Sequence, residues 1–143
     1  MPTTLQDAVD FLQQGGKNGV EIVAGATDWF PARGERPLCQ PILDITKIAE
    51  LQGIGRTLQG WRFGAAVTWS DILTADLPNC FAGLKAAARE VGSVQIQNVA
   101  TLAGNLCNAS PAADGVPPLL TLDAAVDIAS LSGVRSVPCL LYT

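Results

Sequence analysis

Histidine is absent from the 143 residues of this sequence. Its absence removes the most common general base and the most common metal ligand in proteins. It also leaves Ser110 and Cys107 without the imidazole that would activate either one as a nucleophile, and no G-x-S-x-G motif is present. The three lysines, Lys17, Lys47 and Lys85, stand in no context that would replace a histidine. A hydrolase built on Ser110 or Cys107 is therefore disfavoured.

Charged residues are also scarce, at 15% of the chain, and the net charge is −4. The nine basic residues are scattered, whereas a nucleic-acid-binding surface normally gathers lysine and arginine into a patch. No stretch approaches the roughly 20 apolar residues that a membrane span needs, and the opening MPTTLQDAVDF lacks the basic start of a secretory signal. We expect neither a nucleic-acid partner nor a membrane span.

Closely spaced cysteines are missing as well. Cys39, Cys80, Cys107 and Cys139 form no C-x-x-C pair of the kind found in zinc or redox sites. Their spacing also differs from that of a plant-type iron–sulfur cluster. Scattered thiols of this kind are typical of a reducing cytoplasm, which is the location that we expect.

Hydrophobic residues make up 48% of the chain, enough for a folded domain with a substantial core. TTLQDAVDFLQQGG predicts an amphipathic helix, which Thr3 or Thr4 can cap and Gly15-Gly16 can end. Its apolar face comprises Leu5, Ala8, Val9 and Leu12. VEIVAG predicts a short buried strand with Gly25 opening a loop, and PILDI (41–45) predicts a second strand. Residues 1–50 are therefore expected to form a small β–α–β-like α/β subdomain.

A change of pattern near residue 50 predicts a second subdomain over 51–143. Glycine-punctuated apolar runs at 51–54 and 61–63 predict paired strands around a Gly-Arg-Thr turn. Thr68 and Asp71 form a capping signature for a short helix. NCFAGLKAAAREVG predicts a longer helix, with Asn79 as its cap and Gly92 as its end. Its buried face is expected to comprise Phe81, Leu84, Ala88 and Val91.

The last third of the sequence predicts a broken helix and a hairpin. PAADGVPPLLTLDA predicts one or two helical turns interrupted by Pro117-Pro118. AAVDIASLSGVRSVP predicts a hairpin around Ser132-Gly133, and CLLYT follows it without a capping helix. Residues 51–143 are therefore expected to form a largely antiparallel sheet with helices, and the whole chain an α+β fold.

Two segments share an unusual content of small, uncharged residues: VAGATDW (Val23–Trp29) and ATLAGNLCNASPAAD (Ala100–Asp114). Small residues let a backbone approach a ligand closely, and successive N–H groups form a concave anion site. Ser110-Pro111 fits the start of a helix, which adds N–H groups. The segments could thus hold a pyrophosphate without lysine or arginine. Taken singly, the first fits an ordinary strand-to-helix loop better than a ligand site, and the second fits a hairpin followed by a capped helix equally well.

Together these segments resemble the FAD-binding subunit or domain of the molybdenum hydroxylases, the xanthine dehydrogenase and carbon monoxide dehydrogenase group. The first flavin loop of that family reads roughly A-G-G-T-D, and here it stands as Ala24–Asp28. The second reads T-x-G-G-N, then a small-residue run, S-P and an aspartate. Here it stands as Thr101–Asn105, Ser110-Pro111 and Asp114. VGSVQIQNVA and LLTLDAAV also fit, so the resemblance covers nearly the whole chain.

The resemblance implies the two-subdomain FAD-binding fold of the p-cresol methylhydroxylase type, shared with vanillyl-alcohol oxidase. A small α/β subdomain would be followed by an incomplete antiparallel-sheet α+β subdomain, with FAD in the cleft between them. The backbone that would wrap the pyrophosphate belongs to Val23, Ala24, Gly25, Ala26, Thr27 and Asp28. Thr101, Gly104 and Asn105 would complete this cradle beside Ser110, and Asp114 would accept hydrogen bonds from ribityl or ribose hydroxyls.

The same resemblance implies a function in electron transfer. In the family, FAD takes electrons that left the substrate at a molybdenum centre and passed through [2Fe–2S] clusters, and hands them to NAD, oxygen or another acceptor. Because this chain shows no ligands for either centre, the partners implied are a [2Fe–2S] subunit and a molybdopterin-binding large subunit. The alternative is a folded fragment or scaffold of the family that no longer binds FAD.

Three positions depart from the family pattern. Ala26 and Ala103 replace glycines, and their methyl groups are expected to disfavour a positive φ. Val91 stands where some relatives carry an aromatic residue near the cofactor. The family domain also continues past residue 143, with further strands, a flavin-contacting basic residue and a C-terminal domain, so the chain is expected to be a fragment.

Overall fold

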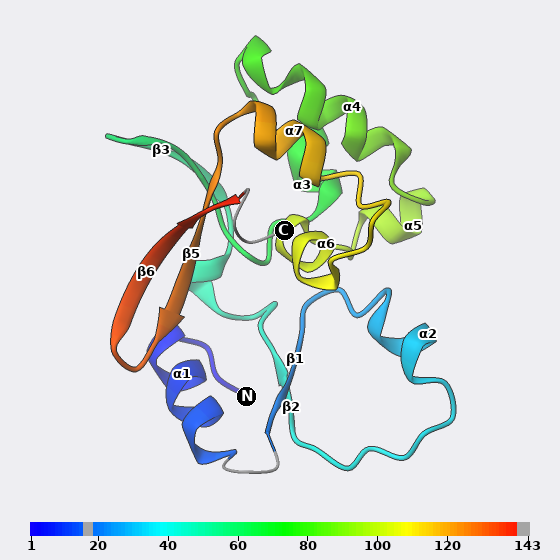
Figure 1. Ribbon diagram of the computed structural model, residues 1–143, viewed down its shortest axis with the longest axis vertical. Helices are drawn as coiled ribbons and strands as arrows, with labels where there is room; N and C mark the ends of the chain where they lie inside the picture. The colour runs from blue at the N-terminus through cyan, green and yellow to red at the C-terminus, as the bar shows by residue number, and fades with distance from the viewer. Residues whose placement is uncertain (16–18, 140–143) are drawn as a thin grey trace.

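The computed structural model describes residues 1–15 and 19–139. The expected helix end at Gly16, Lys17 and the last four residues of CLLYT lie outside this described part. Helices and short strands alternate along the chain, which gives a mixed α+β fold (Figure 1). Within the described residues, no helix has the length and apolar character that crossing a bilayer requires.

The N-terminal part of the chain is a small α/β unit, as predicted. Its elements are α1 (Leu5–Gln14), β1 (Glu21–Val23), α2 (Trp29–Arg33), β2 (Ile42–Asp44) and the 3₁₀ turn η2 (Ala49–Leu51). β1 and β2 pair in parallel, with Glu21 opposite Ile42 and Val23 opposite Asp44. Because parallel strands need a crossover, the chain between them includes α2. The sequence did not predict this five-residue helix, whose Pro31 is tolerated because it lies in the first turn.

The predicted N-terminal helix is confirmed. The Thr4 side chain accepts a hydrogen bond from the Asp7 amide and caps α1, and Gly15 ends it. Ala8 and Val9 are buried, and Ala8 joins Leu43 and Ile48 in the first of two hydrophobic cores. α1 thus covers β2 with the apolar face that its sequence predicted.

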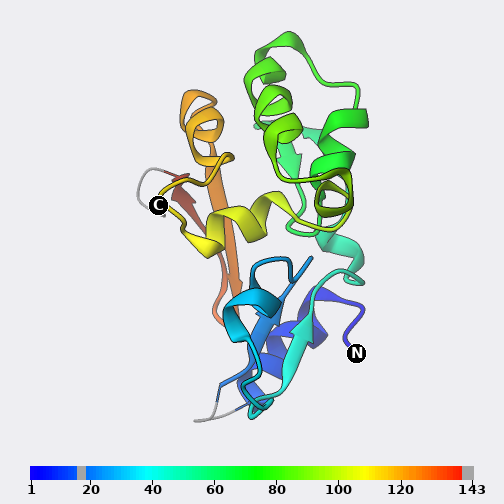
Figure 2. The same ribbon diagram turned by 90° about the vertical axis from the view of Figure 1, so that its right-hand side faces the viewer.

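The second part of the chain contains more helices than the sequence predicted. Its elements are β3 (Ile54–Thr57), β4 (Gly60–Phe63), α3 (Trp69–Thr74), η3 (Asn79–Phe81), α4 (Ala82–Glu90), α5 (Val94–Gln97), α6 (Leu102–Asn108), α7 (Val116–Thr121), β5 (Ala125–Ser130) and β6 (Gly133–Pro138). In Figure 2, α6 lies between the N-terminal unit and the other helices of this part. α6 therefore occupies the boundary between the two parts of the fold.

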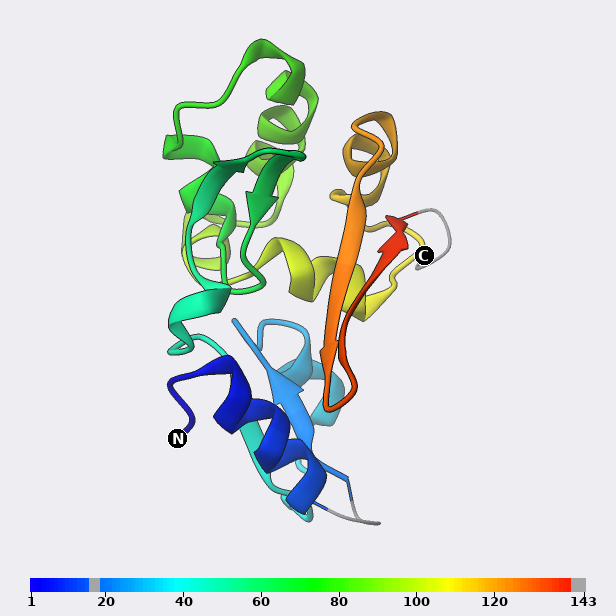
Figure 3. The same cartoon turned by 90° about the vertical axis from the view of Figure 1, so that its left-hand side faces the viewer.

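Both predicted hairpins are present, with their turns displaced. The first turns at Leu58 and Gln59, because Thr57 pairs with Gly60 and the expected turn residues 55–57 belong to β3. In the second, Ser130 pairs with Gly133, so the loop begins one residue earlier than predicted. In the described residues, each hairpin is a separate two-stranded sheet rather than part of one largely antiparallel sheet. The β5–β6 hairpin extends from α7 toward the N-terminal unit (Figure 3).

α3 and α4 follow the predicted apolar pattern. Thr68 and Asp71 form the expected capping box at the start of α3. The predicted face of α4 is buried, but Asn79 does not cap this helix, because it begins a 3₁₀ turn instead. The second core comprises Val67, Trp69, Ile72, Phe81, Leu84, Ala88, Val91, Ala100, Leu102, Leu106, Leu119 and Cys139. Trp69 is its largest fully buried member, and burial raises the pKa of the Cys139 thiol.

The segment 100–121 differs most from its prediction. Leu102–Asn108 forms the helix α6, where a loop or hairpin was expected, because Thr101 supplies a side-chain cap. Ser110-Pro111 starts no helix and lies in a turn. Pro117 and Pro118 do not interrupt α7 but lie within its first turn, where their missing N–H groups have no intrahelical partner to lose.

Candidate functional site

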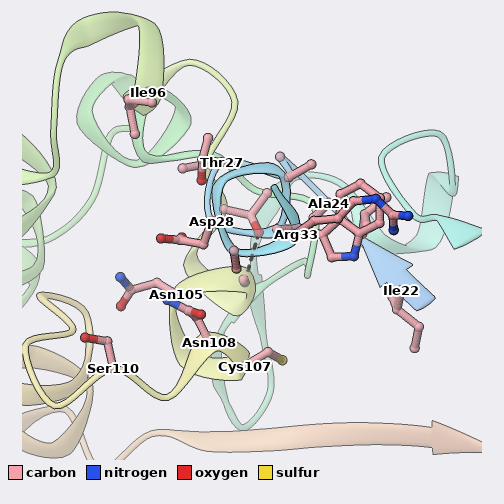
Figure 4. Close-up of a pocket in the computed structure, with 18 of the residues that line it drawn as sticks. Ile22, Ala24, Thr27, Asp28, Arg33, Ile96, Asn105, Cys107, Asn108 and Ser110 are labelled. Atoms are coloured by element: carbon pink, nitrogen blue, oxygen red, sulfur yellow. Dashed lines mark hydrogen bonds between the residues drawn. The ribbon is translucent and has the colours of Figure 1, made fainter. Parts of the chain in front are cut away.

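A cleft of about 1010 Å³ runs between the N-terminal unit and the second part of the chain. Its volume lies at the upper end of the roughly 300–1,000 Å³ typical of small-molecule and cofactor sites. All eleven residues predicted for the site line it: Val23, Ala24, Gly25, Ala26, Thr27, Asp28, Thr101, Gly104, Asn105, Ser110 and Asp114. The fold therefore brings the two small-residue segments together at one surface (Figure 4).

Gly25 is required by the contact between these two segments. A Cβ added there would lie 2.8 Å from the amide nitrogen of Ala100 and closer still to the carbonyl oxygen of Val99. Both neighbours are backbone atoms, which cannot rotate away. Gly25 does not adopt a positive φ, so glycine is needed here because it lacks a side chain and not because of its backbone freedom. The first loop can thus rest directly on the chain that leads into α6.

The two alanines that replace family glycines have opposite backbone conformations. Ala26 has a φ of 54°, in the left-handed region that the added methyl was expected to disfavour. Ala26 adopts this conformation nevertheless, because it is held between β1 and α2, and its carbonyl accepts a hydrogen bond from the Phe30 amide. Ala103, in contrast, lies within α6 in ordinary helical geometry. Left-handed backbone costs a non-glycine residue about 1–2 kcal/mol, so Ala26 carries strain and Ala103 does not.

We expect the two alanine-to-glycine changes to have opposite effects on stability. Ala26→Gly should raise the free energy of unfolding by about 1 kcal/mol, because glycine adopts a positive φ without strain. Ala103→Gly should lower it by about 1 kcal/mol, because glycine is a poor helix former. Urea unfolding followed by circular dichroism measures both changes. Two shifts of the same sign would contradict the assigned backbone conformations.

Thr101 connects the second segment to the core. Only 2% of it is exposed, and its Oγ1 accepts a hydrogen bond of 2.9 Å from the Gly104 amide, which caps α6. A Cβ at Gly104 would lie 2.9 Å from this Oγ1, so a side chain there would force the Thr101 hydroxyl to shift. Thr101 forms a bridge with Thr68 at the start of α3. The starts of the two helices are therefore fixed side by side.

Removing the Thr101 cap is expected to lower the free energy of unfolding. Thr101→Ala should cost about 1 kcal/mol, the usual effect of losing an N-cap side chain, with a further loss from the buried methyl group. Thr101→Ser keeps the hydroxyl and should keep most of the stability. Thermal unfolding of both variants checks this expectation, and equal losses would show that the methyl group, not the cap, matters.

Asn105 already uses one end of its side chain within the protein. Its Oδ1 accepts a hydrogen bond of 3.1 Å from the Gly115 amide, which joins α6 to the start of α7. This bond orients the amide, so the Nδ2 hydrogens remain as donors. Gly115 must lack a side chain, since a Cβ would lie 2.8 Å from Asn105 Oδ1. The Oδ1 of Asn105 thus has a structural role, while its Nδ2 group can donate hydrogen bonds to a ligand in the cleft.

Ser110 and Asp114 line the cleft from the turn after α6. Both are exposed, and Ser110 Oγ accepts the Ala112 amide at 3.2 Å. Because Ser110 starts no helix, the expected helical N–H groups are not supplied there. Asp114 offers a carboxylate that can accept hydrogen bonds from hydroxyl groups, which is the role predicted for it.

The sequence reasoning missed a charged and aromatic part of the cleft. Trp29, Arg33 and Arg36, together with Glu21, line it from β1, α2 and the chain that follows. An anion site without arginine was expected, yet two arginines lie on this cleft. The i, i+4 spacing of Trp29 and Arg33 was the available signal, since such residues meet on one helix face. Within the described residues, no cluster of cysteines and carboxylates could hold a metal ion.

A two-core α+β chain with a large cleft, lined by small residues together with a few charged and aromatic side chains, has the form of a cofactor-binding domain. Residues 1–142 match the family described as the FAD binding domain in molybdopterin dehydrogenase, and the chain belongs to this family.

Its relatives include subunits of oxidoreductase complexes. The chain is 36% identical over 138 residues to the xanthine dehydrogenase FAD-binding subunit of Escherichia coli O157:H7, covering 94% of this chain and 47% of that protein. It is 34% identical over 139 residues to the glyceraldehyde dehydrogenase medium chain of Sulfolobus acidocaldarius, covering 96% and 49%. The chain therefore spans about half the length of these relatives.

Solved structures agree with the fold. Quinoline 2-oxidoreductase from Pseudomonas putida 86 matches with a TM-score of 0.86 at 27% identity, covering 96% of this chain and 48% of that chain. Carbon monoxide dehydrogenase from Hydrogenophaga pseudoflava matches with a TM-score of 0.84 at 25% identity, covering 96% and 48%. The expected family is thus confirmed, and the roles assigned to single residues remain predictions.

Proposed function

We propose that this chain binds FAD in the cleft between its two parts and serves as an electron-transfer module of a molybdenum-containing hydroxylase or dehydrogenase. The observation that carries the proposal is the meeting of the two small-residue segments on one cleft of cofactor size. Membership of the FAD-binding family supports it. When bound, FAD supplies the redox chemistry, while the protein supplies binding and orientation.

The residues present fit such a cofactor. Val23–Asp28 would approach the pyrophosphate with backbone N–H groups, since small side chains leave that backbone accessible. The strained φ of Ala26 supports a functional loop, because strain of this kind concentrates at ligand sites. Thr101 and Gly104 would hold the opposite wall beside Ser110, and Asp114 would accept hydrogen bonds from ribityl or ribose hydroxyls.

We also propose that residues 1–50 and 51–143 act as separate subdomains of this binding site. The two hydrophobic cores support this division, because one draws on residues up to Leu51 and the other begins at Ile54. The partners proposed are a [2Fe–2S] subunit and a molybdopterin-binding large subunit. The names of the relatives support a multi-subunit complex, since one is called an FAD-binding subunit, and a molybdenum cofactor, which the name of the carbon monoxide dehydrogenase structure mentions. The [2Fe–2S] subunit is proposed from the family resemblance alone. The exposed thiols of Cys39 and Cys80 are compatible with a reducing cytoplasm.

Asn105→Asp provides a sharp test of this proposal. Aspartate keeps an oxygen that can accept the Gly115 amide, but it loses the Nδ2 donors and adds a negative charge beside the pyrophosphate. We expect the variant to fold and to bind FAD at least about tenfold more weakly, since a charge-assisted hydrogen bond is worth roughly 1.5–3 kcal/mol. Quenching of flavin fluorescence on titration of the chain into FAD measures the affinity.

Asn79→Asp is the matched control, because it makes the same change of charge on η3, outside the residues that line the cleft. It should bind FAD like the unchanged chain. Equal affinity of Asn105→Asp and the unchanged chain would refute the pyrophosphate cradle. A folded, unchanged chain that binds no FAD at any concentration would favour the alternative, a member of the family that has lost its cofactor.

A further inference from the structure

One end of the cleft carries a stacked pair of an aromatic ring and a cation. The guanidinium carbon of Arg33 lies 5.0 Å from the centre of the Trp29 ring, within the range of a cation–π interaction. Both residues line the cleft and both are half-buried. A planar, charged surface therefore faces the same cavity as the small-residue loop.

The pair is held in place by its neighbours. Trp29 Nε1 donates a hydrogen bond to the Glu21 carboxylate, and Phe30 packs edge-on against the indole with ring centres 4.9 Å apart. Arg33 Nη2 donates to the carbonyl of Arg36 at 2.6 Å, and Arg36 Nε donates back to the carbonyl of Arg33 at 2.9 Å. Mutual bonds of this kind fix the guanidinium plane before any ligand arrives, which lowers the entropic cost of stacking.

The position of the pair identifies which part of a ligand can reach it. In Figure 4, Arg33 and Ile22 lie on one side of the loop that carries Thr27 and Asp28, and Asn105 and Ser110 lie on the other. A pyrophosphate at the loop would therefore have one of its two substituents directed toward Trp29 and Arg33. The other substituent would extend toward α6 and the turn that follows it.

We propose that the Trp29–Arg33 pair is the binding surface for the adenine nucleotide half of FAD. Planar bases stack on guanidinium and indole faces, and each stacked base contributes about fivefold or more to affinity. The Glu21 carboxylate beside the ring offers an acceptor to the exocyclic amino group of adenine, and it repels a phosphate placed directly there. Arg33 faces the cleft with N–H groups that have no protein partner in the described chain, and these can reach the adjoining phosphate.

The isoalloxazine ring fits the other end better. There the cleft is lined by Val91, Ile96 and Ala100, which are apolar and come from the helical part of the chain. The Trp29–Arg33 end is formed by the N-terminal unit, and Phe30, which packs against Trp29, is 66% exposed. The isoalloxazine ring would bury more of its surface against this apolar wall. Adenine, which does not take part in the redox chemistry, can bind to a surface that stays partly exposed to solvent.

This inference rests on the proposed FAD site, and titrations of the 143-residue chain with ADP and with FMN test it separately. Isothermal calorimetry should show ADP binding to the unchanged chain and at least about tenfold weaker binding to Arg33→Met, which removes both the plane and the charge. Arg33→Lys keeps the charge and should recover only part of the loss. FMN should bind the unchanged chain and Arg33→Met alike.

Arg89→Met is the control, because Arg89 is exposed on α4 and does not line the cleft. Equal ADP affinity of Arg33→Met and the unchanged chain, or no ADP binding at all, would overturn the inference. A loss of FMN rather than ADP affinity would overturn it too, since the pair would then hold the isoalloxazine. Normal FAD binding by Arg33→Met would leave the FAD site intact and refute the adenine surface alone.

Discussion

Replacing Gly25 with alanine is expected to lower the free energy of unfolding by about 3 kcal/mol and to abolish FAD binding. The new methyl group would overlap the backbone of Val99 and Ala100, and no side-chain rotation can relieve the contact. Relief requires the two segments to separate, which opens the cleft along its base. Urea unfolding and flavin titration measure the two effects, and both should appear together.

Gly83→Ala is the matched control for this change. Gly83 lies within α4, and a Cβ there would meet no atom within 4 Å. Alanine should therefore stabilise the helix by about 0.5–1 kcal/mol and leave FAD affinity unchanged. If Gly25→Ala proved as stable as Gly83→Ala, the close approach of the two segments would be wrong.

Truncation of Trp69 is expected to be equally damaging. Trp69 is fully buried in the second core, and Trp69→Ala should lower the free energy of unfolding by about 3–5 kcal/mol, as large cavities do. Trp69→Phe should cost only about 1–2 kcal/mol, because the ring is largely replaced and no hydrogen bond is lost. The indole Nε1 is buried and has no hydrogen-bond partner in the described part of the chain.

Trp61→Ala separates the effect of burial from the loss of an aromatic ring. Trp61 packs against Phe81 with ring centres 5.8 Å apart but is only half-buried, so its truncation should cost less than that of Trp69. Chemical unfolding of the three variants gives the comparison. A Trp69→Phe variant as unstable as Trp69→Ala would mean that the indole N–H makes a stabilising bond.

Elements with a complete local signal could be predicted from the sequence. α1 and α3 have both a capping side chain and an apolar face, and each hairpin has two short runs separated by a glycine-containing turn signal, so all four were found. α2 and α5 contain five and four residues, too few for a periodic pattern to emerge. The separation of the two hairpins into different sheets was not predictable either, because the local sequence pattern does not say which strands meet at long range.

Many of the residues that line the cleft could be predicted from the sequence, whereas their hydrogen bonds could not. Small residues and their spacing identified both segments, and the eleven residues predicted from them all line the cleft. The sequence could not show that the hydroxyl of Thr101 caps α6 or that Asn105 holds Gly115, since these bonds depend on how the helices pack. Arg33 was overlooked because the sequence did not predict α2, the helix that carries it. Without that helix, nothing indicated that the charge of Arg33 would lie on the cleft.

The contact of Gly25 with Val99 also bears on the order in which the chain folds. Gly25 and Val99 lie far apart in the sequence, whereas most residues that pack together in each hydrophobic core are separated by fewer residues. Closing a long loop is entropically costly before its contacts form, so such contacts arise late. The cleft is therefore expected to be the last feature to assemble and the first to open. Amide hydrogen exchange around Ala100 should be faster than exchange in α4.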